Sequence, residues 1–195
     1  YSCEGCGVCS HVCPAGAVRL LPDVAGKKEL YTGDRVFSTA TLKMGRGNSG
    51  KLVTEVKKAM LKAAPPCELA IVDGSPGIGC PVIASVNGMD LVLVVAEPSG
   101  SGISDLKRLC ATAATLQVQL AVCVNKYDVS PQHTERIETF CRQQGIAFVG
   151  KIPFDPMAVR AVNEGTTVVD IDCPAGRAVR EIFAKLTALL AERSI

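Results

Sequence analysis

Five short apolar runs set the plan of the chain from residue 36 onward. They are mostly continuous, as in parallel strands covered on both faces, and they lie at residues 36–42, 69–72, 91–96, 120–124 and 147–152. Helical periods separate them, and Ile103, Leu106 and Cys110, for example, fall on one helix face. Parallel strands need crossover connections of this kind. The sequence therefore predicts an α/β fold, a doubly wound, mostly parallel sheet with helices on both faces.

The start of the chain carries a dense group of thiols separated by two, two and three residues: Cys3, Cys6, Cys9 and Cys13. This spacing, followed here by Pro14, is typical of the ferredoxin loop that holds a 4Fe-4S cluster. Gly5 and Gly7 allow the tight turns that aim several sulfurs at one small core. A structural zinc site usually pairs two short clusters across a longer spacer, which this run lacks. Zinc binding, or a purely structural role, is therefore the less favoured alternative. We predict that these four cysteines are metal ligands. In two-cluster ferredoxins the fourth cysteine of such a run binds the other cluster, so the fourth ligand of the cluster held by Cys3, Cys6 and Cys9 stays open.

The remaining cysteines and the overall composition limit the setting and the partners. Six further cysteines are scattered, several of them inside apolar runs: Cys67, Cys80, Cys110, Cys123, Cys141 and Cys173. Scattered thiols predict reduced, buried side chains in a cytoplasmic protein rather than a disulfide framework. No run approaches the ~18 to 20 apolar residues of a membrane span. The formal net charge of +2 is too small to suggest a nucleic-acid partner.

Polar residues and glycines follow three of the apolar runs: Asp73 and Gly77, Asn125 and Lys126, then Pro153 and Asp155. Ligands of open α/β sheets bind at the carboxyl ends of the strands, so these loops are the candidate site. Asp73 could reach the ligand shell of a magnesium ion, and the Asn125 amide could hydrogen-bond a purine edge. Each pattern alone could equally be an ordinary turn or an approach to a helix.

Taken in order, these motifs resemble the MinD/ParA group of P-loop ATPases, in the branch that carries an inserted ferredoxin domain. The cysteine run is similar to the second half of that insert, and residues 45–52 are similar to the glycine loop that follows it. The resemblance implies domains at residues 1–35 (the partial ferredoxin-like insert) and 36–195 (the ATPase-like domain). It also implies cofactors, namely ATP with Mg²⁺ beside the 4Fe-4S cluster, and an ATP-dependent switch that forms a homodimer around nucleotide.

The same resemblance assigns roles to single residues. Asp73 corresponds to the catalytic position of the switch II segment, and Gly77 ends that segment. The base-reading pair is Asn125 and Lys126. Pro153 and Asp155 lie in the loop that closes over the adenine, so these positions, with Gly77, are the expected nucleotide-binding residues.

One departure from the family pattern affects the expected activity. The sequence contains no glycine-rich loop that ends in lysine and then serine or threonine, which cradles phosphates and holds magnesium. Gly45, Gly50 and Lys51 have the right spacing, but Leu52 replaces the hydroxyl residue, so we interpret this segment as a switch-adjacent loop. We expect the chain, which opens at Tyr1, to be a piece of a longer protein. The phosphate loop and first cysteine motif would then lie upstream, and this chain alone would be a poor ATPase.

Two function classes remain open at this stage. The first is an ATP-switched iron-sulfur protein, in which nucleotide state changes the docking or the potential of the cluster for electron transfer or cluster handling. The second is a ferredoxin-like electron carrier on a scaffold that does not hydrolyse ATP. In both, the partner is a redox or iron-sulfur protein that the sequence does not name.

Overall fold

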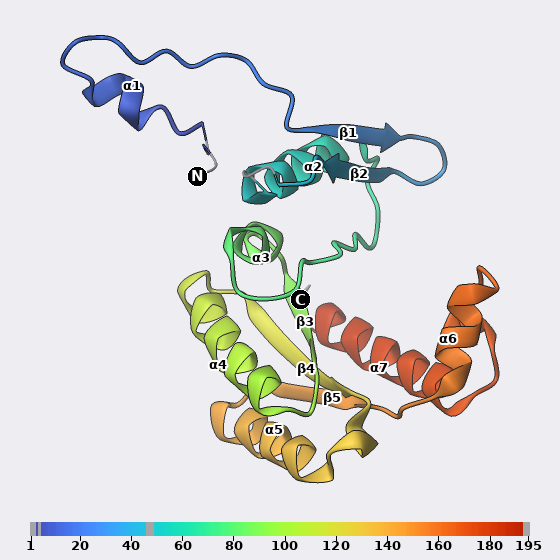
Figure 1. Cartoon of the computed structure of the whole chain (residues 1–195). Helices are drawn as coiled ribbons and strands as arrows, with labels where there is room; N and C mark the ends of the chain where they lie inside the picture. Colours follow the sequence, from blue (N-terminus) through green and yellow to red (C-terminus); the bar gives the residue numbers. More distant parts are fainter. Residues whose placement is uncertain (1–2, 4, 46–48, 193–195) are drawn as a thin grey trace. The chain divides into compact units, whose positions relative to one another are not determined.

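The computed structural model describes residues 3, 5–45 and 49–192. The chain divides into two compact units, Tyr1–Ser85 and Val86–Ile195 (Figure 1). The predicted domains, residues 1–35 and 36–195, remain predictions. Within the described part of the chain, none of the helices combines the length and apolar character that crossing a bilayer requires.

The second unit is built on a parallel sheet of three strands, β3 (Leu91–Ala96), β4 (Gln119–Asn125) and β5 (Ala147–Ile152). Their order is β3-β4-β5, so β4 lies in the centre. Two helices connect them, α4 (Gly100–Thr115) and α5 (Pro131–Gln144). The α/β class and the strands predicted at 91–96, 120–124 and 147–152 are confirmed.

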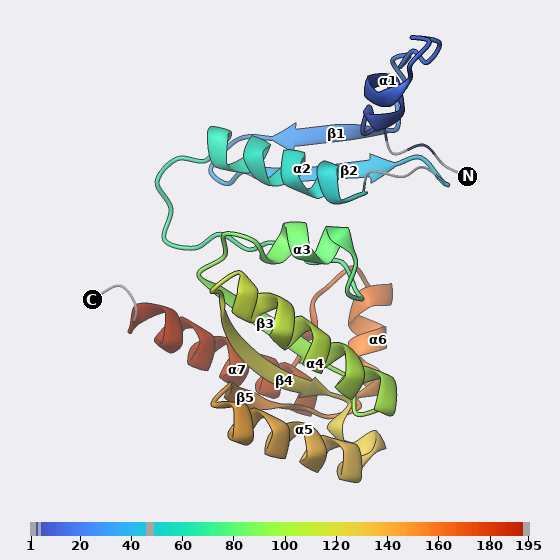
Figure 2. The same ribbon diagram turned by 90° about the vertical axis from the view of Figure 1, so that its left-hand side faces the viewer.

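Helices cover both faces of this sheet (Figure 2). Helices α4 and α5 pack on one face, and α7 (Pro174–Ala191) packs on the other. Between β5 and α7 the chain forms α6 (Pro156–Asn163) and a 3₁₀ turn, η2 (Val168–Asp170). Another 3₁₀ turn, η1 (Tyr127–Val129), follows β4 directly.

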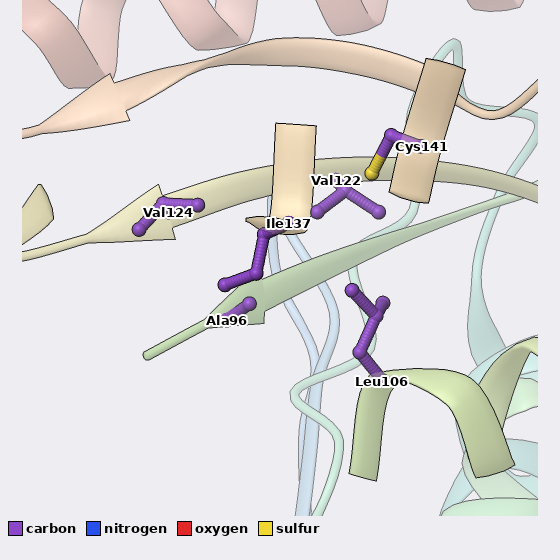
Figure 3. Packing of buried hydrophobic residues seen from close by; sticks show 6 residues of the cluster. All are labelled: Ala96, Leu106, Val122, Val124, Ile137 and Cys141. Carbon is purple, nitrogen blue, oxygen red and sulfur yellow. The ribbon is translucent and has the colours of Figure 1, made fainter. Parts of the chain in front are cut away.

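Alternation along β4 sorts its side chains between two hydrophobic clusters, because successive side chains of a strand point to opposite faces. Val122 and Val124 are fully buried against α4 and α5, where they join four other residues: Ala96, Leu106, Ile137 and Cys141 (Figure 3). Ala121 and Cys123 lie on the opposite face, with Val149 and Ile182. Burial on both faces explains why the strand reads as a continuous apolar run.

The first unit has a different architecture. It contains a short helix, α1 (Val8–Val12), and an antiparallel hairpin of β1 (Gly26–Tyr31) and β2 (Phe37–Leu42). Helix α2 (Ser49–Ala63) packs on β2, where the Ser38 hydroxyl donates to the Val56 carbonyl at 2.9 Å. Helix α3 (Cys80–Val86) follows, and its last residue belongs to the second unit.

Two of the predicted strands differ from the structure. Residues 36–42 do form a strand, but β2 pairs antiparallel with β1 and not within the parallel sheet. Residues 69–72 form no strand, and the Ile71 side chain is 75% exposed. An apolar run becomes a strand only where a neighbouring strand satisfies its backbone groups. Among the described residues, no strand of the first unit pairs with residues 69–72.

Candidate functional site

The carboxyl edge of the parallel sheet collects the loops that follow β3, β4 and β5. Asn125 is the last residue of β4 and lies beside Ile152, the last residue of β5, so Asn125 and Pro153 come to the same edge. Lys126 and Asp155 follow in the same two loops. The structure therefore brings four of the predicted nucleotide-binding residues to one edge of the second unit. Their roles in binding remain predictions.

Lys126 makes the turn out of β4 in an unusual backbone conformation. Its φ is 52° and its ψ is 45°, which is the left-handed region. Among the described non-glycine residues, only Gln117 also has a positive φ. Such a conformation is disfavoured for a residue with a Cβ. The Lys126 ammonium lies 3.6 Å from the Glu97 carboxylate, and this ion pair joins the loops after β3 and β4. Both side chains are exposed, so this ion pair contributes little stability.

Asp128 joins the loops after β4 and β5. Its Oδ1 atom accepts a hydrogen bond from the backbone N–H of Phe154 at 2.8 Å. The turn that carries Asp128 is itself held by Thr134, a buried residue of α5 whose hydroxyl donates to the Tyr127 carbonyl at 2.8 Å. The position of the loop after β5 is therefore set by a side chain from the loop after β4.

Asp155 has a structural task that the sequence did not reveal. Its Oδ1 atom accepts from the Met157 N–H at 3.0 Å, and its Oδ2 atom accepts from the Ala175 N–H at 3.1 Å. These two bonds hold the pKa of the Asp155 carboxyl below its usual value, and the Met157 bond has the larger effect. One carboxylate thus satisfies free amide groups in the first turns of both α6 and α7.

Asp73 and Gly77 lie in the first unit, in the irregular segment before α3, and both are exposed. Gly77 has a φ of 89°, a conformation that glycine adopts without strain. The roles of Asp73 as the catalytic residue and of Gly77 as a nucleotide-binding residue remain predictions.

The segment that imitates a phosphate loop is only partly described. Residues 46–48 of the 45–52 segment lie outside the described residues. Gly50 and Lys51 fall in the first turn of α2, and Lys51 is exposed. A Cβ added at Gly50 would lie 3.0 Å from the Cys80 Cβ and 3.1 Å from the Cys80 carbonyl oxygen. Close packing of α2 against Cys80 is therefore one reason for a glycine at this position.

The cysteine run lies at the start of the first unit. Cys3, Cys6 and Cys9 are exposed and Cys13 is partly buried, and α1 carries Cys9. Gly5 and Gly7 have φ values of 66° and 80°, so they make the left-handed turns expected of them. Among the described residues, no three histidine, cysteine or acidic side chains gather into a group that could hold a metal ion.

Backbone amides already bond two of the four sulfurs. The Cys3 sulfur accepts from the Gly5 N–H and the Cys13 sulfur from the Ala17 N–H, each at 3.3 Å. The Ala17 amide has the largest effect on the Cys13 thiol, and together with the neighbouring Ala15 amide it lowers the pKa of that thiol. The donors thus suit an iron-sulfur cluster in their chemistry and spacing, although the loop would have to close around it.

The sequence predictions missed two residues at the sheet edge, Asp128 and Phe154. The only available signal was their placement, since Asp128 follows Asn125 by three residues and Phe154 lies between Pro153 and Asp155.

Burial expectations for the scattered thiols were also partly wrong. Cys123, Cys141 and Cys173 are buried, but Cys67 and Cys80 are exposed.

Comparison with known proteins supplies relatives and folds, although no family model matches the chain. An uncharacterized protein of Methanocaldococcus jannaschii is 28% identical over 145 residues, 74% of this chain and 48% of that protein. An uncharacterized ATP-binding protein of the same organism is 33% identical over 126 residues, 61% of this chain and 46% of that protein. An iron-sulfur cluster carrier protein of Pyrococcus furiosus is 30% identical over 158 residues, 73% of this chain and 54% of that protein.

Two solved structures share the fold. The MinD cell division protein of Aquifex aeolicus superposes with a TM-score of 0.54 at 24% identity, covering 72% of this chain and 59% of that protein. The cell division ATPase MinD of Pyrococcus furiosus gives a TM-score of 0.57 at 17% identity, with the same coverage of each chain. The present chain spans about half the length of the curated relatives it matches.

The fold is thus that of the MinD ATPases. Together with the sequence relatives, which include proteins named iron-sulfur cluster carriers, this fold supports a MinD/ParA-type branch of the P-loop ATPases.

Proposed function

We propose that this chain belongs to an iron-sulfur protein of the MinD/ParA-type ATPase superfamily, in which nucleotide state controls how a bound cluster is presented. The observation that carries the proposal is the four-cysteine run at the start of a chain with these relatives. The finer alternatives, electron transfer and cluster handling, both require the cluster to be bound by this chain. Cluster binding is therefore the first property to test.

The proposed ligands are Cys3, Cys6, Cys9 and Cys13. Three of these thiols are exposed and the fourth, Cys13, is only partly buried, which supports the assignment because a cluster can reach them without unfolding a core. The amide bond to the Cys13 sulfur would favour its thiolate, the form that binds iron. A bound 4Fe-4S cluster would supply a one-electron redox centre, whose potential responds to such hydrogen bonds and to solvent exposure.

The proposed nucleotide site is the carboxyl edge of the parallel sheet. Asn125 and Lys126 would face the base, and residues 153–155 would form the loop beside it, which three carboxylate–amide bonds hold in place. In the first unit, Asp73 is proposed as the catalytic residue and Gly77 as a nucleotide-binding residue. We propose ATP with Mg²⁺ as the ligand and a homodimer around nucleotide as the active assembly.

A second candidate is an electron carrier that never hydrolyses nucleotide. This alternative would hold if the complete protein carries no glycine-rich loop that ends in lysine and then serine or threonine, a loop that the present sequence does not contain. The two candidates differ in whether nucleotide changes the cluster. They predict the same cysteine ligands.

Anaerobic reconstitution of the chain with ferrous iron and sulfide tests the proposal. We expect a brown protein with a broad absorption band near ~400 nm and about four iron and four sulfide ions per chain. Cys6→Ser and Cys9→Ser should lose most of this absorption. The matched control, Cys67→Ser, removes an exposed thiol outside the motif and should leave it unchanged. Tight, stoichiometric zinc binding without colour would contradict the iron-sulfur assignment.

A further inference from the structure

The chain from Gly7 to Leu20 folds back on itself. Helix α1 begins after Gly7, whose carbonyl accepts the Ser10 N–H at 3.0 Å. Directly after α1, Cys13 starts a tight turn in which its carbonyl accepts the Gly16 N–H at 3.1 Å. A turn at the end of a helix lets the segment that follows return along that helix.

Two contacts hold the returning segment on α1. The Ser10 hydroxyl donates to the Val18 carbonyl at 2.7 Å. A Cβ added at Gly7 would lie 3.7 Å from the Leu20 Cδ1 atom, so the Leu20 side chain lies over this glycine. Residues 13–25, all of them described, form neither helix nor strand. The position of Leu20 therefore depends on these local contacts and not on a ladder of backbone bonds.

The returning segment brings an apolar side chain to the middle of the cysteine run. Gly7, over which Leu20 lies, stands between Cys6 and Cys9, two of the proposed ligands, and α1 carries Cys9. The side chains of Val18 and Leu20 are 39% and 46% exposed, whereas the neighbouring Leu21 is 70% exposed. The side of the segment that turns toward α1 is thus apolar.

An apolar side chain beside a metal site limits the access of water and lowers the local dielectric constant. A thiolate-bound iron-sulfur cluster gains one negative charge when it is reduced, and water stabilises the more highly charged form. Apolar covering should therefore lower the reduction potential of such a cluster. It should also slow the reaction of the cluster with small molecules dissolved in water.

We propose that Leu20 is an apolar cover for a cluster held by the cysteine run, and that Ser10 is the positioning residue that keeps Leu20 in place through Val18. This inference rests on the proposed function, which supplies the cluster. It adds no ligand. It names two residues that set the solvent access of the cluster, and through it the potential and the lifetime of the cluster.

Variants of Leu20, reconstituted anaerobically with ferrous iron and sulfide, test the cover. Leu20→Ser should raise the midpoint potential in a redox titration followed by EPR. It should also increase several-fold the rate at which a water-soluble ferrous chelator removes the absorption near ~400 nm. Leu20→Ala, a milder change, should shift both values in the same direction, and Leu20→Met, which stays apolar, should behave as wild type. The matched control is Leu21→Ser, which changes the adjacent, more exposed leucine and should alter neither value.

Variants of Ser10 test the positioning role. Ser10→Ala loses the bond to the Val18 carbonyl, so it should shift the potential and the decay rate in the same direction as Leu20→Ser but less far. Ser10→Thr keeps a hydroxyl group and should restore the wild-type values. Because Ser10 acts through Leu20, the double variant Ser10→Ala/Leu20→Ser should match Leu20→Ser alone.

The outcomes separate this inference from the proposed function. If the unmodified chain forms no cluster on reconstitution, the iron-sulfur part of the proposed function fails, and the cover role fails with it. If the chain forms the cluster but Leu20→Ser keeps the wild-type potential and decay rate, only the cover role is overturned. Equal shifts in Leu20→Ser and Leu21→Ser would contradict a specific role for Leu20. A Ser10→Thr variant that behaves as Ser10→Ala would contradict the positioning role.

Discussion

The Asp155 carboxylate accepts a hydrogen bond from the backbone N–H of Ala175, twenty residues further along the chain, at 3.1 Å. Its other oxygen accepts from Met157 in the first turn of α6. Both partners are amides that a helix leaves unpaired at its start, and a negative charge is favourable there. Asp155 therefore orders the path of the chain from β5 through α6 to α7.

We predict that Asp155→Ala lowers the melting temperature by several degrees, because two amides lose their acceptor. Asp155→Asn keeps one side-chain oxygen as an acceptor, so its melting temperature should lie between those of wild type and Asp155→Ala. The folded-state pKa of Asp155 is lowered, so its stabilising effect is present above the unfolded pKa and disappears as pH falls through the folded value. In a series of thermal melts from pH 7 downward, the difference between wild type and Asp155→Asn should be largest at pH 7 and shrink as the pH falls through the folded-state pKa.

The left-handed turn at Lys126 gives a second prediction. Lys126→Gly should raise the free energy of unfolding by about 0.5–1 kcal/mol in urea, because glycine enters this region without strain. Gln117→Gly relieves the same kind of strain at φ 55° away from the sheet edge and should stabilise similarly. Only Lys126→Gly should also weaken Mg-ATP binding. If both variants bind nucleotide equally well, Lys126 acts only in the turn and not in nucleotide binding.

The second unit was predictable from sequence because its strands and helices are neighbours along the chain. The apolar run at residues 120–124 is buried on both faces by α4, α5 and α7. Its unbroken run of apolar residues, without alternation, is what predicts burial on both faces. Residues 91–96 and 147–152 pair directly with it. In each case the local pattern and the tertiary environment agree.

The first unit was less predictable, because its partners are not set by local pattern. Strand β1 reads Gly-Lys-Lys-Glu-Leu-Tyr, with too few apolar residues to signal a strand, and forms by pairing with β2. The run at residues 69–72 has the composition of a strand but no ladder in the described residues of its unit. The bond from Phe154 to Asp128 spans 26 residues and depends on strand register, which no motif encodes.

Buried thiols should make stability fall at alkaline pH. Burial raises the pKa of both Cys123 and Cys141 to about 11, above the value of about 8.5 for an unfolded thiol. Because the folded-state pKa is raised, the stabilising effect is complete below pH 8.5 and is lost as pH rises toward 11. Urea unfolding between pH 8 and pH 11 should show this decline. A Cys123→Ala/Cys141→Ala variant, although less stable at pH 8, should decline less steeply.

Lys57 should stabilise the first unit by joining α2 to the end of α3. Its ammonium donates to the carbonyl oxygens of Ala84 and Ser85, each at 3.0 Å, and both carbonyls lie in the last turn of α3. Lys57→Met should cost about 1 kcal/mol, because charged donors to carbonyl groups are lost from a partly exposed site. Lys58→Met, which removes an exposed neighbour, is the control. Faster hydrogen exchange in residues 80–86 of Lys57→Met alone would confirm the contact.

Lys51 provides the last prediction, which concerns the segment that imitates a phosphate loop. The residue is exposed in the first turn of α2, Gly50 is accounted for by close packing against Cys80, and Leu52 supplies no hydroxyl for magnesium. We therefore expect Mg-ATP to bind this chain weakly, with turnover near background, and Lys51→Ala to change its affinity less than twofold by calorimetry. Lys43→Ala is a control for the loss of one positive charge. Micromolar ATP affinity that disappears in Lys51→Ala but survives in Lys43→Ala would instead identify residues 45–51 as a working phosphate site.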